Sequence, residues 1–263
     1  MEVHKRCSAS WIEDQDFFRF SGIFRPVFLY VKAPVHLEDL WLRAGLEEDN
    51  TTGTLAPRLK LSATEGALPA DTAVHCRVTA PGGTAVYDAP LTLHAEGEFL
   101  IAESIRLPGI RAWNHSDPAL YTVTLTLTAN GREQEVTGYR TGFRRFEMKD
   151  RVMCLNGERV FFNGVNRHEW NPETGRAIGP EDMFRAMETF RRNNINAVRT
   201  CHYPDQSLWY DLCDEKRRLH DRRSQPGKPR FLAENGRHRT QLERAGQPAG
   251  MEGLRGGPGP QHV

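Results

Sequence analysis

Residues 120–129 constrain the fold most, because apolar side chains alternate there with four threonines. A period of two is typical of a strand with one face on a core and the other in solvent. Similar short segments, separated by turn-forming residues, run from residue 33 to residue 143. About 110 residues of this kind predict an immunoglobulin-like β-sandwich. The expected strands are residues 59–63, 72–79, 91–94, 99–107 and 120–129, with turns at Pro81-Gly82-Gly83 and Asn130-Gly131. Before the sandwich, the β-branched and aromatic residues of 23–31 predict one further strand.

The pattern changes after Phe143. We predict strands at residues 160–162 and 195–198, each followed by a polar loop and then a helix. The first helix should begin at Pro180, since proline fits a first turn and acidic residues follow at its positive end. This order predicts the opening of a parallel (β/α)8 barrel, with about two units present. The apolar residues of the expected helices are Met183, Met187 and Phe190, then Leu208, Trp209 and Leu212.

Polar residues follow both predicted barrel strands. Since the carboxyl ends of barrel strands share one mouth, these residues are candidates for one site. Imidazole and guanidinium groups donate directed hydrogen bonds to hydroxyls, and an aromatic face such as that of Trp170 can cover a pyranose. Trp209 is expected in the core instead. Any one of the polar residues alone could equally serve the structure, but their coincidence in both loops favours a functional site. They are Asn166, Arg167, His168 and Glu169, then Arg199, His202 and Tyr203.

Two alternatives concern metal ions. His168, Glu169 and His202 could ligate a metal, but their spacing matches no zinc pattern. The acidic residues at positions 13–16 are either a solvated turn or a set of carboxylates for a cation or for sugar hydroxyls. The residues alone leave this second choice open.

The cysteines and the apolar runs indicate in which cellular compartment the protein lies. Five cysteines, scattered and without C-x-x-C spacing, argue against a disulfide framework and a zinc site. No apolar run approaches the roughly 20 residues that span a bilayer, and the first residues lack the apolar core of a signal peptide. We therefore expect a cytoplasmic protein that does not contact a membrane.

Several stretches, in order, resemble the β-galactosidases of glycoside hydrolase family 2. The most specific is residues 11–25, W-I-E-D-Q-D-F-F-R-F-S-G-I-F-R. T-G-F-R at residues 141–144 resembles the junction of the family's sandwich with its barrel. N-G-V-N-R-H-E at 163–169 and N-A-V-R-T-C-H-Y-P at 196–204 resemble the first two barrel units. The resemblance covers residues 1–215.

The resemblance implies a multidomain fold that is β in its first part and α/β in its second. Residues 1–32 would be the C-terminal remnant of a jelly-roll domain, 33–143 the sandwich, and 144–215 the first βα units of a TIM barrel. Asp16 would help bind a sodium ion and the sugar. His168, Arg199 and His202 would line the galactose subsite, with Asn166 and Glu169 supporting it. The substrate would be a β-galactoside, and the parent enzyme a homo-oligomer.

Family members hydrolyse terminal β-galactosides with retention, using two glutamates about 5–5.5 Å apart. Both lie later in the family's barrel, and we find no counterpart in this sequence. We therefore name no catalytic residue and expect the chain to be inactive alone. The parent could instead be a β-glucuronidase or β-mannosidase, or the chain a non-catalytic sugar-binding module. A third possibility is complementation by a separately encoded remainder.

Residues 216–263 differ from the rest of the chain. Although the net charge of the chain is +1, this segment holds eleven Lys and Arg against four Asp and Glu. Permitted codons for residues 220–232, read one base later, encode T-I-D-E-A-N-L-E-S-H-G-S-W, which restores the family's D-E-A-N and E-x-H-G motifs. We interpret the segment as out of frame, expect it to be disordered, and expect the family's magnesium site to be missing. The alternative, a basic arm for nucleic acid, is disfavoured because Phe231 is its single aromatic residue.

Overall fold

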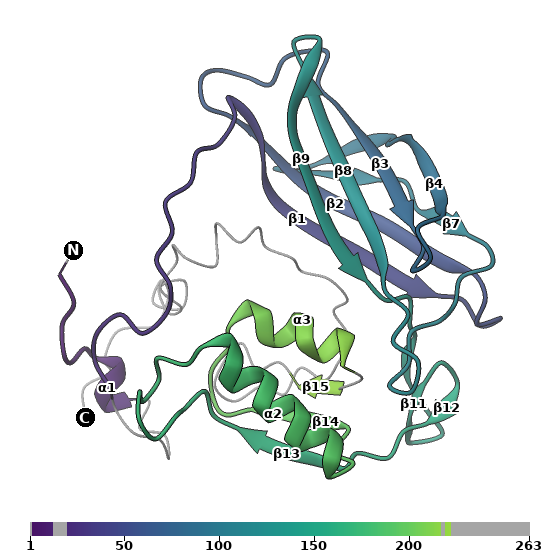
Figure 1. Ribbon diagram of the computed structural model, residues 1–263. Helices are drawn as coiled ribbons and strands as arrows, with labels where there is room; N and C mark the ends of the chain where they lie inside the picture. The colour runs from purple at the N-terminus through teal and green to yellow at the C-terminus, as the bar shows by residue number, and fades with distance from the viewer. Residues whose placement is uncertain (1, 13–19, 217–218, 222–263) are drawn as a thin grey trace, which may run out of the picture.

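The computed structural model describes residues 2–12, 20–216 and 219–221 (Figure 1). The candidate ligand Asp16 and all residues after Asp221 lie outside this part of the chain. The first described element is a single helical turn, α1 (Ala9–Ile12), and residues 20–34 lead to the sandwich without forming a helix or a strand. None of the helices in the described part of the chain is long and apolar enough to cross a bilayer.

Two antiparallel sheets form the sandwich that the alternating pattern predicted. One has the order β1-β2-β6-β5, with β7 also paired to β2, and the other has the order β4-β3-β8-β9. In β8 the apolar residues are buried between the sheets and the threonines lie on the other face, as predicted. The strands are β1 (Val35–Leu46), β2 (Gly53–Ala63), β3 (Ala73–Thr79), β4 (Ala85–Pro90), β5 (Leu93–Glu96), β6 (Phe99–Ala102), β7 (Ile105–Leu107), β8 (Tyr121–Ala129) and β9 (Arg132–Thr141).

The hairpin between β8 and β9 turns on Asn130 and Gly131, with φ angles of 54° and 67°. Positive φ at both central residues is the geometry that Asn-Gly accepts in a tight hairpin, so this predicted turn is confirmed. The core between the sheets includes Leu40, Leu42 and Leu59, which are fully buried. Burial of each such side chain contributes roughly 1.5–3 kcal/mol, so this core stabilises the sandwich strongly.

A small three-stranded sheet follows the sandwich, and a parallel sheet follows it. The small sheet contains β10 (Phe146–Lys149), β11 (Val152–Leu155) and β12 (Glu158–Arg159). The parallel sheet has the order β13-β14-β15, and its helices α2 and α3 pack on one face (Figure 1). These elements are β13 (Gly164–Arg167), α2 (Pro180–Arg192), β14 (Ala197–Thr200), α3 (Ser207–Glu215) and β15 (Leu219–Asp221).

The start of α2 is as predicted. Pro180 occupies the first turn, and the side chain of Asp182 accepts a hydrogen bond from the backbone N–H of Gly179 at 3.1 Å. This hydrogen bond is the main reason that the pKa of Asp182 lies below its usual value. The apolar stripe Met183, Met187 and Phe190 is buried against the sheet and α3, which confirms its orientation.

Both predicted barrel strands were placed too early in the sequence. The strand expected at residues 160–162 begins only at Gly164, and the one expected at 195–198 begins at Ala197. Asparagine side chains are the reason: Asn163 N donates to Asn196 Oδ1 at 2.8 Å, and Asn196 Nδ2 donates to the carbonyl of Phe161 at 2.7 Å. These bonds occupy backbone groups that a strand ladder would use. Phe161 is left largely exposed.

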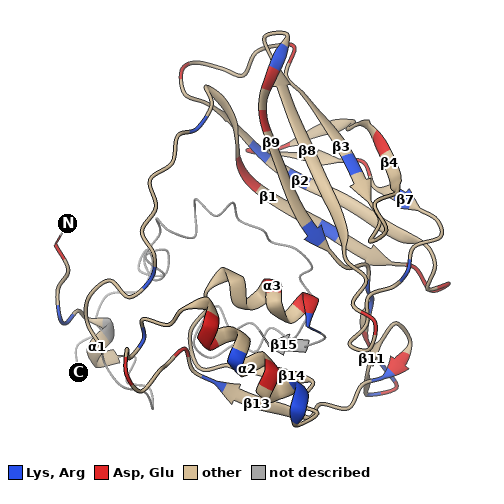
Figure 2. Cartoon of the chain, viewed as in Figure 1, with Lys and Arg blue, Asp and Glu red and all other residues tan. Residues whose placement is uncertain are grey.

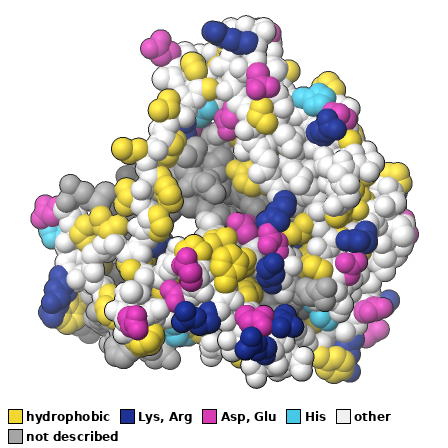
Figure 3. Space-filling model, in the orientation of Figure 1, with side chains coloured by type: hydrophobic (Ala, Val, Ile, Leu, Met, Phe, Trp, Pro, Cys, Tyr) yellow, Lys and Arg dark blue, Asp and Glu magenta, His cyan; other side chains and the backbone are white. Residues whose placement is uncertain are grey.

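The strand expected at residues 23–31 does not form. The described residues around it provide no partner strand, and a strand needs a hydrogen-bonded neighbour. Its side chains Val27, Phe28 and Leu29 are exposed, and Figure 3 shows hydrophobic side chains along this segment. Without a paired strand there, no jelly-roll remnant is visible in the described residues.

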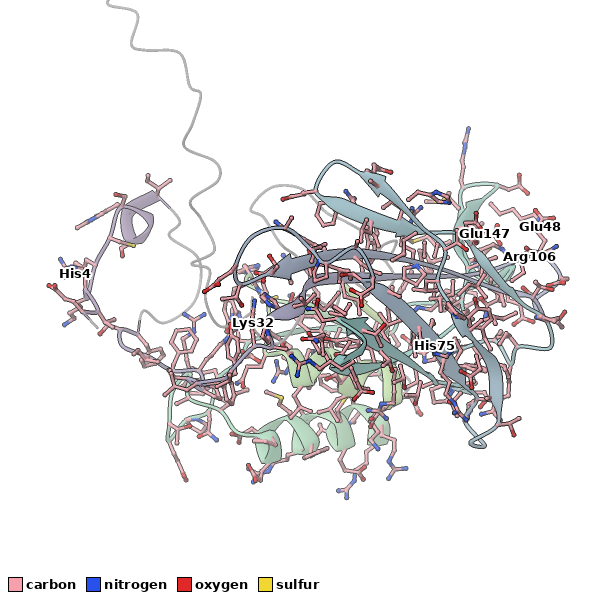
Figure 4. All side chains as sticks on the ribbon, turned by 90° about the horizontal axis from the view of Figure 1, so that it is seen from above. His4, Lys32, Glu48, His75, Arg106 and Glu147 are labelled. Carbon is pink, nitrogen blue, oxygen red and sulfur yellow. The ribbon has the colours of Figure 1, made fainter. Side chains whose placement is uncertain are left out.

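The view from above shows how far the N-terminal segment extends. His4 lies far out on one side, Lys32 lies close to β1, and Arg106 lies at the other end of the sandwich (Figure 4).

The segment from residue 216 onward, where we expect disorder, contains four described residues, Lys216 and Leu219–Asp221. Leu219–Asp221 form β15 and pair in parallel with β14. An open strand edge presents unpaired backbone groups, and these pair with little regard to the side chains they meet. The other residues of this segment lie outside the described part, apart from Lys216, which ends α3.

The sandwich and the parallel sheet meet at Trp113. Its indole Nε1 donates to the carbonyl of Asp214 at 2.8 Å, and the Arg144 guanidinium lies 4.4 Å above its ring. Arg144 also pairs with the Asp214 carboxylate at 3.1 Å. Gly142 faces the indole so closely that an added Cβ would lie 2.7 Å from Trp113 Cβ. The junction is therefore held by specific contacts around Trp113. Figure 2 shows that charges of both signs are interspersed over the sandwich and the parallel sheet.

Candidate functional site

The side chains at the ends of β13 and β14 alternate between two faces. The strands pair so that Asn166 lies beside Arg199 and Arg167 beside Thr200. Arg167 and Thr200 are buried on the helix side, whereas Asn166 and Arg199 lie on the opposite, more open face. Pairing continues past the strands, because Cys201 N donates to the Arg167 carbonyl at 2.8 Å. Residues 168 and 201 thus point to the same side as Asn166 and Arg199, where His168 is partly buried and Cys201 is almost fully buried.

Four of the predicted site residues meet on the open face: Asn166, His168, Arg199 and His202, which we call the strand-end cluster. Arg199 Nη1 donates to Asn166 Oδ1 at 3.2 Å, and Arg199 Nη2 lies 3.2 Å from His202 Nδ1. The rings of His168 and His202 lie edge to face with centroids 5.7 Å apart. The parallel pairing of β13 with β14 therefore brings these four residues together, although paired residues such as Asn166 and Arg199 are 33 positions apart in the sequence.

The contact between Arg199 and His202 determines which ring nitrogen of a neutral His202 carries the proton. A guanidinium has donors and no acceptor, so Nδ1 of His202 accepts this hydrogen bond. A neutral His202 then carries its proton on Nε2, where it can donate to a ligand. The cluster offers donors from Arg199 and His202 together with the amide of Asn166, a set that suits a polyhydroxylated molecule.

Glu169 does not join the strand-end cluster. It is only 2% exposed and lies on the other face, where Oε2 accepts from Arg25 Nη2 at 3.1 Å and Oε1 accepts from Gln206 N at 2.8 Å. Arg167 Nη1 is 3.8 Å from the same carboxylate and forms a shorter ion pair with Asp205. Arg25, Arg167, Glu169 and Asp205 form an arginine–carboxylate layer behind the cluster.

Burial dominates the electrostatics of this layer. The side chain of Asp205 is fully buried, and burial raises its pKa to about 7 although Arg167 lowers it. Its Oδ1 atom has no hydrogen-bond partner, which agrees with a carboxyl group that binds a proton readily. Because Glu169 and Asp205 are buried and held by arginines, they position the loops at the strand ends and are not exposed to a ligand.

The aromatic candidates divide between core and surface. Trp209 is fully buried, with the Arg167 guanidinium 3.7 Å above its ring, so its predicted place in the core is confirmed. Trp170 is 43% exposed and can present a face. The Tyr203 hydroxyl accepts from the backbone N–H of Glu169 at 2.9 Å, and its ring centroid is 6.1 Å from that of His168. Tyr203 thus braces the loop that carries His168.

Sequence reasoning missed the roles of three residues. Arg25 reaches Glu169 across 144 positions, and no local pattern marks that contact. Asp205 follows Tyr203-Pro204 and could have been noticed as an acidic residue just before a helix. Cys201 lies close to His168 and His202, so it replaces Glu169 as the third member of the possible metal-ligand set that the sequence suggested. The predicted sodium ligand Asp16 lies outside the described residues.

These features define a class: a β-sandwich protein whose chain continues into parallel β/α units with a polar cluster at the strand ends. Residues 35–144 match the family model "Glycosyl hydrolases family 2", and residues 146–217 match the model of that family's TIM barrel domain. The chain belongs to glycosyl hydrolase family 2. Within the described part of the chain, none of the five cysteines forms a disulfide bond.

Similar curated proteins are named β-galactosidases. That of Halalkalibacterium halodurans is 41% identical over 216 residues, covering 82% of this chain and 21% of that protein. The β-galactosidase large subunit of Latilactobacillus sakei is 44% identical over 217 residues, covering 82% of this chain and 33% of that protein. The chain therefore spans between 21% and 33% of the length of these two relatives.

Similar solved structures are β-glucuronidases. β-Glucuronidase 3 of Bacteroides uniformis has a TM-score of 0.66 and 28% identity, covering 78% of this chain and 25% of that one. The β-glucuronidase of Parabacteroides merdae has a TM-score of 0.64 and 26% identity, covering 71% of this chain and 23% of that one. The solved structures that share this fold and the curated relatives are thus named for two different sugars.

Proposed function

We propose that this chain carries one wall of the sugar-binding site of a β-galactosidase. The observation that carries the proposal is the strand-end cluster, in which Arg199 orients Asn166 and His202 so that their polar groups lie on one open face. The relatives named β-galactosidase, at 41% and 44% identity, support galactose as the sugar.

Each residue of the wall has a distinct task in this proposal. His202 donates from Nε2 to a sugar hydroxyl, the amide of Asn166 binds a neighbouring hydroxyl, and Arg199 holds both side chains in place. His168 packs edge to face against His202 and fixes the position of that ring. Glu169 supports the site from behind, as part of the arginine–carboxylate layer. Asp16 would add a carboxylate for the sugar and for a sodium ion.

The proposal assigns bond cleavage to groups outside this chain. Retaining hydrolysis needs an acid and a nucleophile on opposite sides of the anomeric carbon, about 5–5.5 Å apart. Next to the cluster, the described residues offer Glu169 and Asp205, which are buried and paired with arginines. The two glutamates and the magnesium ligands would come from the rest of the parent enzyme. The name "large subunit" of one relative supports a parent with several subunits.

A β-glucuronide is the second candidate substrate, because the similar solved structures are β-glucuronidases. A uronate would need a cation free to pair with its carboxylate. Arg199 already donates to Asn166 and contacts both His202 and Cys201, so its donors are largely occupied. This arrangement favours a neutral sugar.

Binding and turnover test the proposal separately. The purified chain should not hydrolyse a chromogenic β-galactoside, and turnover would refute the assignment of cleavage to other segments. A thio-linked β-galactoside, which resists hydrolysis, should shift the imidazole NMR signals of His168 and His202. Arg199→Ala should abolish these shifts, whereas Arg191→Ala on the exposed face of α2 should keep them. Equal shifts with a β-glucuronide would favour the second candidate.

A further inference from the structure

The open face contains a second arrangement of donors, made by His168, Cys201 and His202, which we call the His–Cys–His triad. One ligand atom from each residue lies within 4.8 Å of the others. The strand register produces this closeness. Arg167 and Thr200 are paired in register, so the next residues, His168 and Cys201, emerge side by side, and His202 follows directly.

The donor types suit a thiophilic divalent cation. Two imidazole nitrogens and one sulfur are ligands that zinc takes in tetrahedral sites, and three protein ligands leave a fourth position open. Tetrahedral bonds of 2.0–2.3 Å put neighbouring donors roughly 3.5 Å apart. The triad therefore has to close by about 1 Å, a distance that side-chain rotation covers because His168 and His202 are only partly buried.

Arg199 links this triad to the sugar cluster. Its Nη1 lies 2.9 Å from Cys201 Sγ, and its Nη2 lies 3.2 Å from His202 Nδ1. Because the sulfur already accepts a hydrogen bond from Arg199, a metal ion that binds it has to displace this donor. A dication at the triad would repel the same guanidinium and displace it from His202. The sugar donors of the strand-end cluster would then lose their arrangement.

We propose that the His–Cys–His triad is a site for Zn2+ or a similar thiophilic cation, and that its occupation excludes sugar from the strand-end cluster. On binding, the S–H bond of Cys201 breaks, its proton passes to solvent, and the sulfur ligates the metal. The metal site stands on the triad alone, whereas the exclusion of sugar rests on the proposed function. The two parts can therefore fail independently.

Cobalt is the probe for the metal site. Co2+ added to the full metal-free chain should give a thiolate-to-cobalt charge-transfer absorption that saturates at one ion per chain and is bleached by Zn2+. Cys201→Ser should remove this absorption. The matched control Cys7→Ser, at an exposed cysteine outside the triad, should retain it. Circular dichroism of each variant shows whether it is folded.

The outcomes separate the two parts. An absorption that persists in folded Cys201→Ser, that is lost in Cys7→Ser, or that never appears in the wild-type chain overturns the metal site. With the site established, Zn2+ should abolish the NMR shifts that the thio-β-galactoside causes in the wild-type chain and leave those of Cys201→Ser unchanged. Shifts that persist in the zinc-loaded wild-type chain overturn the exclusion. If metal-free protein shows no shifts, the proposed function fails, and the exclusion falls with it.

Discussion

Replacement of Arg167 by methionine tests the arginine–carboxylate layer most severely. Arg167 is 8% exposed, and the substitution removes the cation between two carboxylates that are almost completely buried, those of Glu169 and Asp205. Removing one partner of a buried ion pair costs about 3–5 kcal/mol, since the remaining charge is buried without compensation. Methionine keeps most of the volume above the Trp209 ring, so the loss reports charge more than packing.

The cost of this substitution should depend on pH. The folded-state pKa of Asp205 lies at about 7, above its ordinary value of 3.8, and loss of Arg167 raises it further. Below pH 3.8 the carboxyl group of Asp205 is protonated in both the folded and the unfolded chain. Between pH 3.8 and about 7 only the folded chain keeps this proton, so the free energy of unfolding falls as the pH rises. Arg167→Met should therefore destabilise the chain more at pH 8 than at pH 5.

Urea unfolding followed by tryptophan fluorescence measures this effect, since Trp209 lies directly beneath the guanidinium. Asp205→Asn is the matched control, because it removes the carboxylate that titrates and should flatten the pH dependence. If Arg167→Met shifts the free energy of unfolding by less than about 0.5 kcal/mol at pH 8, within the range of ordinary surface substitutions, the layer is not an electrostatic support and the reasoning is refuted.

Three further changes probe other parts of the chain. Leu59→Ala leaves a cavity between the sheets and should lower the free energy of unfolding of the sandwich by about 2–5 kcal/mol in urea denaturation; a loss below 1 kcal/mol would contradict the packing. Gly142→Ala puts a Cβ 2.7 Å from Trp113 and should cost roughly 1–3 kcal/mol, seen as a lower melting temperature, whereas an unchanged melting temperature would show that the junction is loose. Arg25→Ala frees the N-terminal segment from Glu169 and should speed proteolysis within residues 20–32 while the sandwich stays resistant; unchanged cleavage would mean that this contact does not hold the segment.

The sandwich could be predicted from sequence because its signals are local. The alternation in β8 and the turn at Asn130 and Gly131 each follow from a few neighbouring residues. The same holds for α2, whose start is set by Pro180 and Asp182. The barrel strands were misplaced because apolar content alone does not reveal that Asn163 and Asn196 bind the backbone with their side chains.

The candidate site could be predicted only in part. The strand register brings Asn166 and Arg199 together, and the parallel arrangement of two polar loops was enough to expect that. Glu169 faces away from its neighbour His168 because the alternation of β13 continues past Arg167. We did not predict this because we expected the strand at residues 160–162 and a loop after it. The contact of Arg25 with Glu169 depends on how the N-terminal segment crosses the strand ends, which no periodicity encodes.

The most direct test of the central claim, that these strand ends form one wall of a galactoside site, is the kcat/KM of a chimera. The segment of the Latilactobacillus sakei large subunit that aligns with this chain would be replaced by the matching residues of this chain. The folded chimera should hydrolyse a chromogenic β-galactoside at least about tenfold more efficiently than the matching β-glucuronide. Arg199→Ala in the chimera should remove most of that activity. A folded chimera that prefers the glucuronide, or that is indifferent to the loss of Arg199, would contradict the account.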